Sequence, residues 1–184
     1  MTDTITDFSV IIAGLDEISE ELVSSVSHVV SLVDPGTVLP TSLDSIVGTN
    51  RLRIDVHDAF AEDRDKVAPS QATIENLIVY ANKLEVSNLS QLLVHCHMGR
   101  SRSPAAAAII LVALGCSPVS VFEKLYLSRK PIWPNWSMVE LGDRALGCNG
   151  ELMYGCEQIY NRTRLEYPKW VEDPNPENAI NATL

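Results

Sequence analysis

The sequence predicts an α/β fold: a mainly parallel central β-sheet flanked by helices on both faces, with a helical C-terminal part. Up to Gly115, short apolar runs typical of buried strands alternate with segments of helical character. After Gly115 only helical patterns follow. The length of 184 residues, with 46% hydrophobic and 21% charged residues, fits one globular domain. We therefore expect a single domain over residues 1–167 and a flexible tail over residues 168–184.

The four expected strands are short and rich in apolar or β-branched residues. They are Phe8–Ala13, Ser27–Val33, Leu52–Val56 and Gln91–Val94. The second ends at Asp34-Pro35-Gly36, a turn sequence with Pro and Gly in favoured places. The third alternates apolar and polar residues, as a half-buried strand does. In a parallel sheet the ligand crevice lies beyond the carboxyl ends of the strands, so functional residues are expected there.

The expected helices are defined by apolar periodicity and by start and stop signals. They cover Leu15–Ser25, Pro69–Val86, Ser103–Leu114, Ser117–Ser128, Ser137–Leu146 and Glu151–Leu165. Ser103-Pro104 is a helix-start signal, and Gly115 is a typical exit. The segment from Pro168 onward is polar and rich in Pro and Asn, which favours a flexible tail.

Charge and composition exclude several classes of function. The net charge of −10 opposes binding to nucleic acid or to anionic lipid. The longest apolar run, Ala105–Leu114, is far shorter than the roughly 20 residues that span a bilayer. The start of the chain lacks signal-peptide features, and its four cysteines form no CxxC pair. We expect a cytoplasmic protein without metal or cofactor, without a nucleic-acid partner and without membrane insertion.

One segment, His95-Cys96-His97-Met98-Gly99-Arg100-Ser101-Arg102-Ser103-Pro104, joins an expected strand to an expected helix. The free N–H groups that enter such a helix converge and can bind a tetrahedral anion. Gly99 gives the backbone freedom that a tight turn needs. The same N–H groups favour a thiolate at Cys96, and the planar Arg102 side chain can hold two phosphoryl oxygens. These residues predict transfer of a phosphoryl group to sulfur.

This segment resembles the signature of the protein tyrosine phosphatase family, which is His-Cys, five residues, Arg, then Ser or Thr. His95, Cys96, Arg102 and Ser103 match it, and Gly99 matches within the loop. The likeness covers residues 8–159 and is greatest to the dual-specificity-like branch, among small bacterial tyrosine-phosphatase-family proteins. It implies a cysteine-phosphatase-like fold and a hydrolase that forms a cysteinyl-phosphate intermediate. Its implied substrate is phosphotyrosine in proteins, or phosphoserine and phosphothreonine as well.

The resemblance also implies roles for single residues. Cys96 is the expected nucleophile, Arg102 the phosphate clamp, and Ser103 a helper in the breakdown of the intermediate, or simply a helix N-cap. The phosphate is expected to contact His97, Met98, Gly99, Arg100, Ser101 and Arg102. His95 would brace the loop through hydrogen bonds, and Asn135 would lie near the hydrolytic water. The expected general acid is Asp58, at the end of a strand pattern, with Asp55, Asp63 and Asp65 as competitors.

Two alternatives stay open. The same chemistry could act on a phosphoinositide or another small phosphate ester, which Arg100 favours, or the loop could bind phosphate without reacting. Met98 stands where relatives usually have Ala, so the substrate pocket is expected to differ from theirs. A second Cys-x5-Arg-Thr string, from Cys156 to Thr163, lacks a glycine, a preceding His and a preceding strand. We interpret it as a buried cysteine in a helix, and we likewise expect Cys116 to be buried rather than redox-active.

Overall fold

The computed structural model describes residues 9–60, 63–84 and 91–172. Its centre is a four-stranded sheet of order β1-β4-β2-β3 in which every pair is parallel. The strands are β1 Ser9–Ala13, β2 His28–Val33, β3 Arg51–Asp55 and β4 Gln91–His95. Each lies within two residues of its expected range, and the predicted α/β class is confirmed. β4 lies inside the sheet, so the loop that follows it leaves from the middle of the carboxyl edge.

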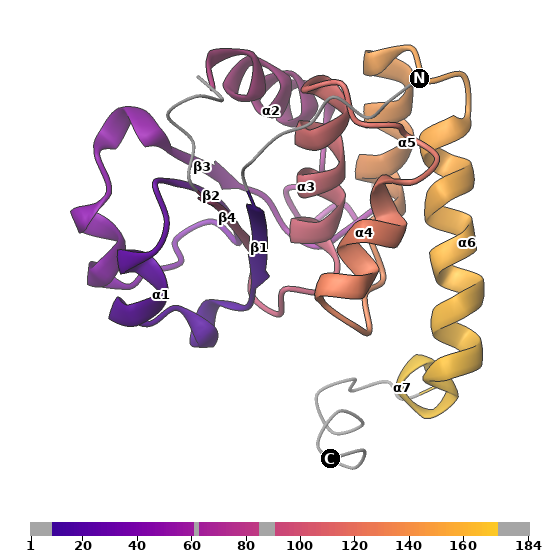
Figure 1. Ribbon diagram of the computed structural model, residues 1–184, viewed down its shortest axis with the longest axis horizontal. Coiled ribbons are helices and arrows are strands. Elements are labelled where there is room, and N and C mark those ends of the chain that lie inside the picture. Colours follow the sequence, from indigo (N-terminus) through magenta and orange to yellow (C-terminus); the bar gives the residue numbers. More distant parts are fainter. Residues whose placement is uncertain (1–8, 61–62, 85–90, 173–184) are drawn as a thin grey trace.

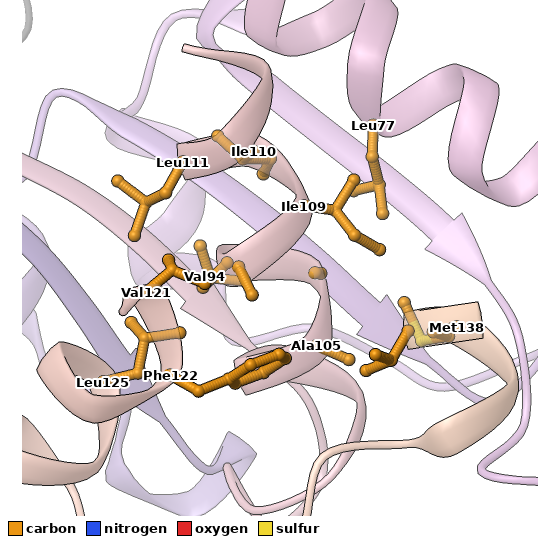
Figure 2. Packing of buried hydrophobic residues seen from close by; sticks show 14 of the residues in the cluster. Leu77, Val94, Ala105, Ile109, Ile110, Leu111, Val121, Phe122, Leu125 and Met138 are labelled. Carbon is orange, nitrogen blue, oxygen red and sulfur yellow. The ribbon is translucent and has the colours of Figure 1, made fainter. Parts of the chain in front are cut away.

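The larger layer of helices covers one face of the sheet (Figure 1). It consists of α2 Gln71–Lys83, α3 Arg102–Ala113, α4 Val121–Ser128, α5 Trp136–Leu146 and α6 Glu151–Glu166. The central helix, α3, packs against strands and helices alike because its first turns are made of the small, fully buried residues Ala105–Ala108. Figure 2 shows Ile109 of α3 beside Leu77 of α2, with Phe122 and Leu125 of α4 on the other side. This core fixes α3 rigidly against the sheet.

A thinner layer covers the opposite face. It is made of α1 Glu20–Ser24 and the short 3-10 segment Thr41–Ser45, which bury a second apolar cluster against β1, β2 and β4. The single helix expected over Leu15–Ser25 is in fact a 3-10 turn, Leu15–Glu17, followed by α1. The reason is local: the Ser19 side chain accepts a hydrogen bond from the Leu22 N–H, which makes Ser19 an N-cap and starts the helix after it.

The end of the domain differs from expectation. The flexible tail was expected from Pro168, but Pro168–Glu172 form a further short helix, α7, packed on α6. Its Trp170 side chain is buried, and that burial holds the segment against the domain. The boundary at residue 167 is therefore corrected, whereas residues 173–184 lie outside the described residues. Within the described part, each helix is too short or too polar to cross a membrane.

Candidate active site

Cys96 lies at the bottom of the loop between β4 and α3, at the carboxyl edge of the sheet. Only 2% of its surface is exposed. Its Sγ accepts a hydrogen bond from the Gly99 N–H at 3.2 Å and lies 3.3 Å from the Ser103 Oγ. Both groups can therefore donate a hydrogen bond to the sulfur.

The loop can turn this tightly because of Gly99. Its φ is +67°, in the left-handed region, and a Cβ at this position would lie 2.6 Å from the carbonyl carbon of Ala13. The backbone of the loop therefore rests directly on the end of β1. A hydrogen bond of 2.8 Å from the Leu15 N–H to the His97 carbonyl fixes the same contact. Only glycine fits this position without displacement of one backbone by another.

The backbone N–H groups of the loop form a binding site for an anion. In the described part of the chain, the N–H groups of residues 97, 98, 100, 101 and 102 have no hydrogen-bond acceptor. These N–H groups are therefore free to donate to an anion at the loop. The first turn of α3 adds its partial positive charge at the same place. Phosphate is an anion of the right shape for such a cradle.

Arg102, the first residue of α3, is 4% exposed and points its guanidinium back to the sheet edge. Its Nη1 donates to Asp34 Oδ1 at 2.7 Å and to the Val56 carbonyl at 2.6 Å. Its Nε is buried and has no partner among the described residues, so a donor is left for a bound anion. The sequence identified Asp34 only as a turn residue, because its contact with Arg102 spans the fold.

His97 is held by the same turn. The Asp34 N–H donates to His97 Nε2 at 3.2 Å, and this nitrogen lies 3.6 Å from Asp34 Oδ1. Met98 is 37% exposed and lines a pocket beside the loop.

Asp58 reaches the loop from the segment after β3. Its Oδ1 accepts hydrogen bonds from Ser101 Oγ at 2.9 Å and from Asn135 Nδ2 at 2.8 Å. Of the other carboxylates considered, Asp55 pairs with Arg53 on β3, Asp63 accepts from the Phe60 N–H, and Asp65 is exposed. Among these four described carboxylates, only Asp58 contacts the cysteine loop.

Asn135 links the start of α5 to Asp58. Its Oδ1 accepts from the Met138 N–H at 3.0 Å and caps α5, while its Nδ2 holds Asp58. Its backbone N–H also donates to the Ser101 carbonyl at 3.1 Å. The Pro-rich segment before α5 is therefore fastened to the cysteine loop.

Ser103 and Arg100 lie differently from the simplest expectation. Helix α3 begins at Arg102, so Ser103 is inside its first turn and is not the N-cap; its hydroxyl faces Cys96 instead. Arg100 donates from Nη1 to the Pro131 carbonyl at 2.7 Å. Burial, together with the nearby Arg129 cation, lowers the pKa of Arg100 to about 10.

His95 is fully buried below the loop, at the end of β4. Its Nε2 lies 2.6 Å from the Ser31 Oγ on β2, so its hydrogen bond joins the two strands. Burial lowers the pKa of His95 to about 4, which keeps the ring neutral near pH 7. It supports the base of the loop through the sheet.

Arg129 is a site residue that sequence reasoning missed. It follows α4, and it donates to the carbonyls of Gly99 at 2.9 Å and Met98 at 3.1 Å. It also forms an ion pair of 2.9 Å with Glu17. Although burial opposes ionisation, hydrogen bonds from Arg129 and the Gly14 N–H hold the pKa of Glu17 below its usual range. A single arginine between two helical patterns gave no signal of this contact.

The remaining cysteines lie away from the loop. Cys116 follows the far end of α3, and a helix of 12 residues is about 18 Å long. A disulfide needs Cα atoms less than about 7 Å apart, so Cys116 cannot pair with Cys96 in this fold. Cys156 is fully buried in α6, and burial raises its pKa to about 12. The second Cys-x5-Arg sequence therefore lies in a helix with its cysteine buried, as predicted.

Comparison with known proteins finds proteins of similar structure but none of similar sequence. No protein-family model matches the chain, and no curated protein matches it. Human DUSP28 is 23% identical, with 76% of this chain and 94% of that chain covered and a TM-score of 0.58. PTPMT1 in complex with PI(5)P is 20% identical, with 84% and 94% covered and a TM-score of 0.56. The PTP-2 phosphatase of Cydia pomonella is 22% identical, with 72% and 83% covered and a TM-score of 0.55. The chain therefore has the α/β fold of the dual-specificity-like phosphatases.

Proposed function

We propose that the protein is a cysteine-dependent phosphomonoester hydrolase that acts on phosphotyrosine in proteins. The observation that carries this proposal is the loop around Cys96. The sulfur lies 3.3 Å from the Ser103 hydroxyl in a loop whose other N–H groups have no acceptor in the described part of the chain, and Arg102, which begins the following helix, has an unpaired Nε. A phosphate bound by these donors has its phosphorus directly above a stabilised sulfur anion.

The proposed first step is attack of the Cys96 thiolate on phosphorus. The bond from phosphorus to the ester oxygen breaks as the phosphorus–sulfur bond forms, and Asp58 gives its proton to the departing oxygen. Asp58 is in place for this because Ser101 and Asn135 hold it over the loop. The cradle and Arg102 stabilise the charge of the transition state. These steps use no metal and no cofactor.

The proposed second step is hydrolysis of the cysteinyl phosphate. Asp58, now a carboxylate, removes a proton from a water molecule that attacks phosphorus, and the thiolate leaves. Ser103, 3.3 Å from the sulfur, can donate to that thiolate. Asn135 orients Asp58, while His95 supports the loop from below. The other loop residues, His97, Met98, Gly99 and Arg100, surround the phosphate through their backbone.

We further propose that residues 9–172 act as one domain in the cytoplasm.

A second candidate is hydrolysis of a phosphoinositide. Two observations favour it: the cation at Arg100, and the likeness of fold to a structure of PTPMT1 in complex with PI(5)P. The net charge of −10 opposes an anionic membrane surface. The third candidate, a phosphate-binding module without turnover, keeps the cradle and leaves Cys96 unreactive.

Phosphate release from a panel of substrates separates the three. The panel holds a phosphotyrosine peptide, a phosphoserine peptide and a soluble phosphoinositide, each with wild type, Cys96→Ser and the control Cys148→Ser. Turnover of the phosphotyrosine peptide that is lost in Cys96→Ser and kept in Cys148→Ser is the expected result. Turnover of the lipid alone selects the second candidate, and binding without turnover selects the third.

A further inference from the structure

A pocket of about 440 Å³ opens beside the cysteine loop. One side is formed by residues of the site already described: Asp58, Met98, Arg100, Ser101 and Asn135. The other side is apolar, with walls from the segment after β3, from the segment before α5 and the start of α5, and from α6 and α7. The apolar wall consists of Phe60, Trp133, Pro134, Trp136, Tyr160, Trp170 and Val171.

The aromatic side chains of this wall hold each other in place. Trp133 stacks on Tyr160 with ring centroids 4.2 Å apart, and the Trp136 ring lies 5.9 Å from that of Tyr160. The Tyr160 hydroxyl donates to the Pro134 carbonyl. The pocket is therefore preformed, with rigid rings that suit stacking with another ring.

The pocket lies next to the place of the phosphate and does not contain it. Neither Cys96 nor Arg102 lines it, whereas Asp58 and Ser101 belong both to the pocket and to the edge of the loop. A group on the ester oxygen of a bound phosphate passes Asp58, its proposed proton donor, and reaches the mouth of the pocket. The organic part of the substrate therefore lies beside the apolar wall of the pocket.

The volume of the pocket limits what can fill it. A cavity of about 150 Å³ holds one benzene molecule, so this pocket has room for more than the single ring of a phosphotyrosine. Its mouth carries apolar side chains that the fold leaves in water: Phe60 is 53% exposed and Met98 37%. Such exposed apolar surface around a cavity typically marks a binding site.

We propose that this pocket binds a second aromatic side chain, next to the phosphotyrosine in a peptide substrate. This inference rests on the proposed function, because it names the class of peptide that the same site selects. A peptide is favoured over a lipid because the chain carries a net charge of −10, which repels an anionic bilayer. Arg100 also lines the pocket, and its Nε has no hydrogen-bond partner among the described residues, so the polar side of the pocket keeps a donor for a peptide carbonyl.

Peptide binding to Cys96→Ser tests the inference without any need for turnover. Three phosphotyrosine peptides are compared: one with Phe before the phosphotyrosine, one with Phe after it, and one with Ala on both sides. The chain has three tryptophans, Trp133, Trp136 and Trp170, and all of them line the pocket. Intrinsic tryptophan fluorescence therefore reports directly on occupation of the pocket. At least one Phe peptide should bind roughly tenfold more tightly than the Ala peptide.

Matched variants locate the effect. In the Cys96→Ser background, Phe60→Ala removes an exposed part of the wall, and Val171→Asp places a charge in it. Each should reduce the preference for Phe to less than about threefold. Leu127→Ala, which removes an exposed apolar side chain on α4 away from the pocket, should leave the preference at its full value.

The outcomes separate this inference from the proposed function. Equal affinity for all three peptides overturns the inference, as does a fluorescence change with phosphoinositide vesicles that no peptide produces. Turnover of 4-nitrophenyl phosphate by wild type tests the proposed function separately. Preferential binding of a Phe peptide without any turnover by wild type would support the pocket and contradict the hydrolase.

Discussion

Arg102 Nη1 and Asp34 Oδ1 lie 2.7 Å apart, so an ion pair joins the start of α3 to the turn after β2. The same nitrogen donates to the Val56 carbonyl, which leaves Nη1 fully occupied inside the protein. The Nε of Arg102, by contrast, has no hydrogen-bond partner among the described residues. Asp34 therefore orients the guanidinium and, in the proposed mechanism, determines which of its edges faces the phosphate.

Asp34→Asn should lower kcat/KM for phosphotyrosine peptides by about tenfold to a hundredfold, because a misaligned clamp loses contact with the transition state. The inhibition constant of inorganic phosphate should rise as well, since the same guanidinium holds the ground-state anion. Asp44→Asn, which removes an exposed ion pair with Arg51, is the control and should change neither constant. A less stable Asp34→Asn protein with normal kinetics would show that Asp34 only stabilises the fold.

Asp58→Asn should slow esters with poor leaving groups by about a hundredfold and esters with good leaving groups much less. The reason is that an alkoxide or phenoxide of high pKa needs a proton as it departs, whereas 4-nitrophenoxide does not. The measurement is kcat for a series of aryl phosphates of graded leaving-group pKa. Asp55→Asn, on the exposed side of β3, should behave as wild type. Equal slowing across the series in Asp58→Asn would mean that another group is the acid.

The fold was predictable because its signals are local. β2, β3 and β4 are short apolar or alternating runs, and α3 combines a Ser-Pro start with a run of alanines. Such patterns depend on neighbouring residues, which the sequence shows directly. Helix α7 was missed because the segment is short and polar and only one of its side chains, Trp170, is buried, so it shows no apolar periodicity. From its sequence alone, a polar segment with one tryptophan has the composition of a flexible tail.

The residues of the site that lie in the cysteine loop were predictable from the sequence. The residues that contact this loop from distant parts of the chain were not. Cys96, Gly99 and Arg102 lie in one short segment, so their spacing already indicated an anion cradle. Asp34 and Arg129 contact that segment across the fold, and neither has a sequence pattern that points to it. Asp58 was chosen because the family resemblance implies an Asp on a loop after an earlier strand, and Asp58 follows the strand pattern that became β3; the structure brings it into contact with Ser101 and Asn135.

Gly99→Ala should destabilise the protein by about 3 kcal/mol and abolish turnover, because the new methyl group meets the backbone of β1 in addition to the strain of a positive φ. The measurement is the free energy of unfolding in urea, together with kcat. Gly36→Ala is a matched control: its φ is +83° and nothing lies within 4 Å of an added Cβ. It should cost only about 1 kcal/mol, from the backbone conformation alone, and leave turnover intact. Similar losses at both positions would contradict the close contact between the loop and β1.

The neutral state of His95 should make stability depend on pH. Burial lowers the pKa of His95 from 6.5 to about 4 in the folded chain, whereas the unfolded chain keeps the ordinary value. Between these two pH values the unfolded chain binds more protons than the folded protein. The contribution of neutral His95 to the free energy of unfolding is therefore complete above about pH 6.5 and is lost as the pH falls toward 4. The expected loss in the free energy of unfolding is about 3 kcal/mol over that interval. Urea unfolding of wild type and His95→Gln at several pH values isolates it, because contributions from other groups, including His28, cancel in the difference. A constant difference between the two proteins from pH 7 to pH 4 would show that His95 takes up its proton as readily in the folded protein as in the unfolded chain.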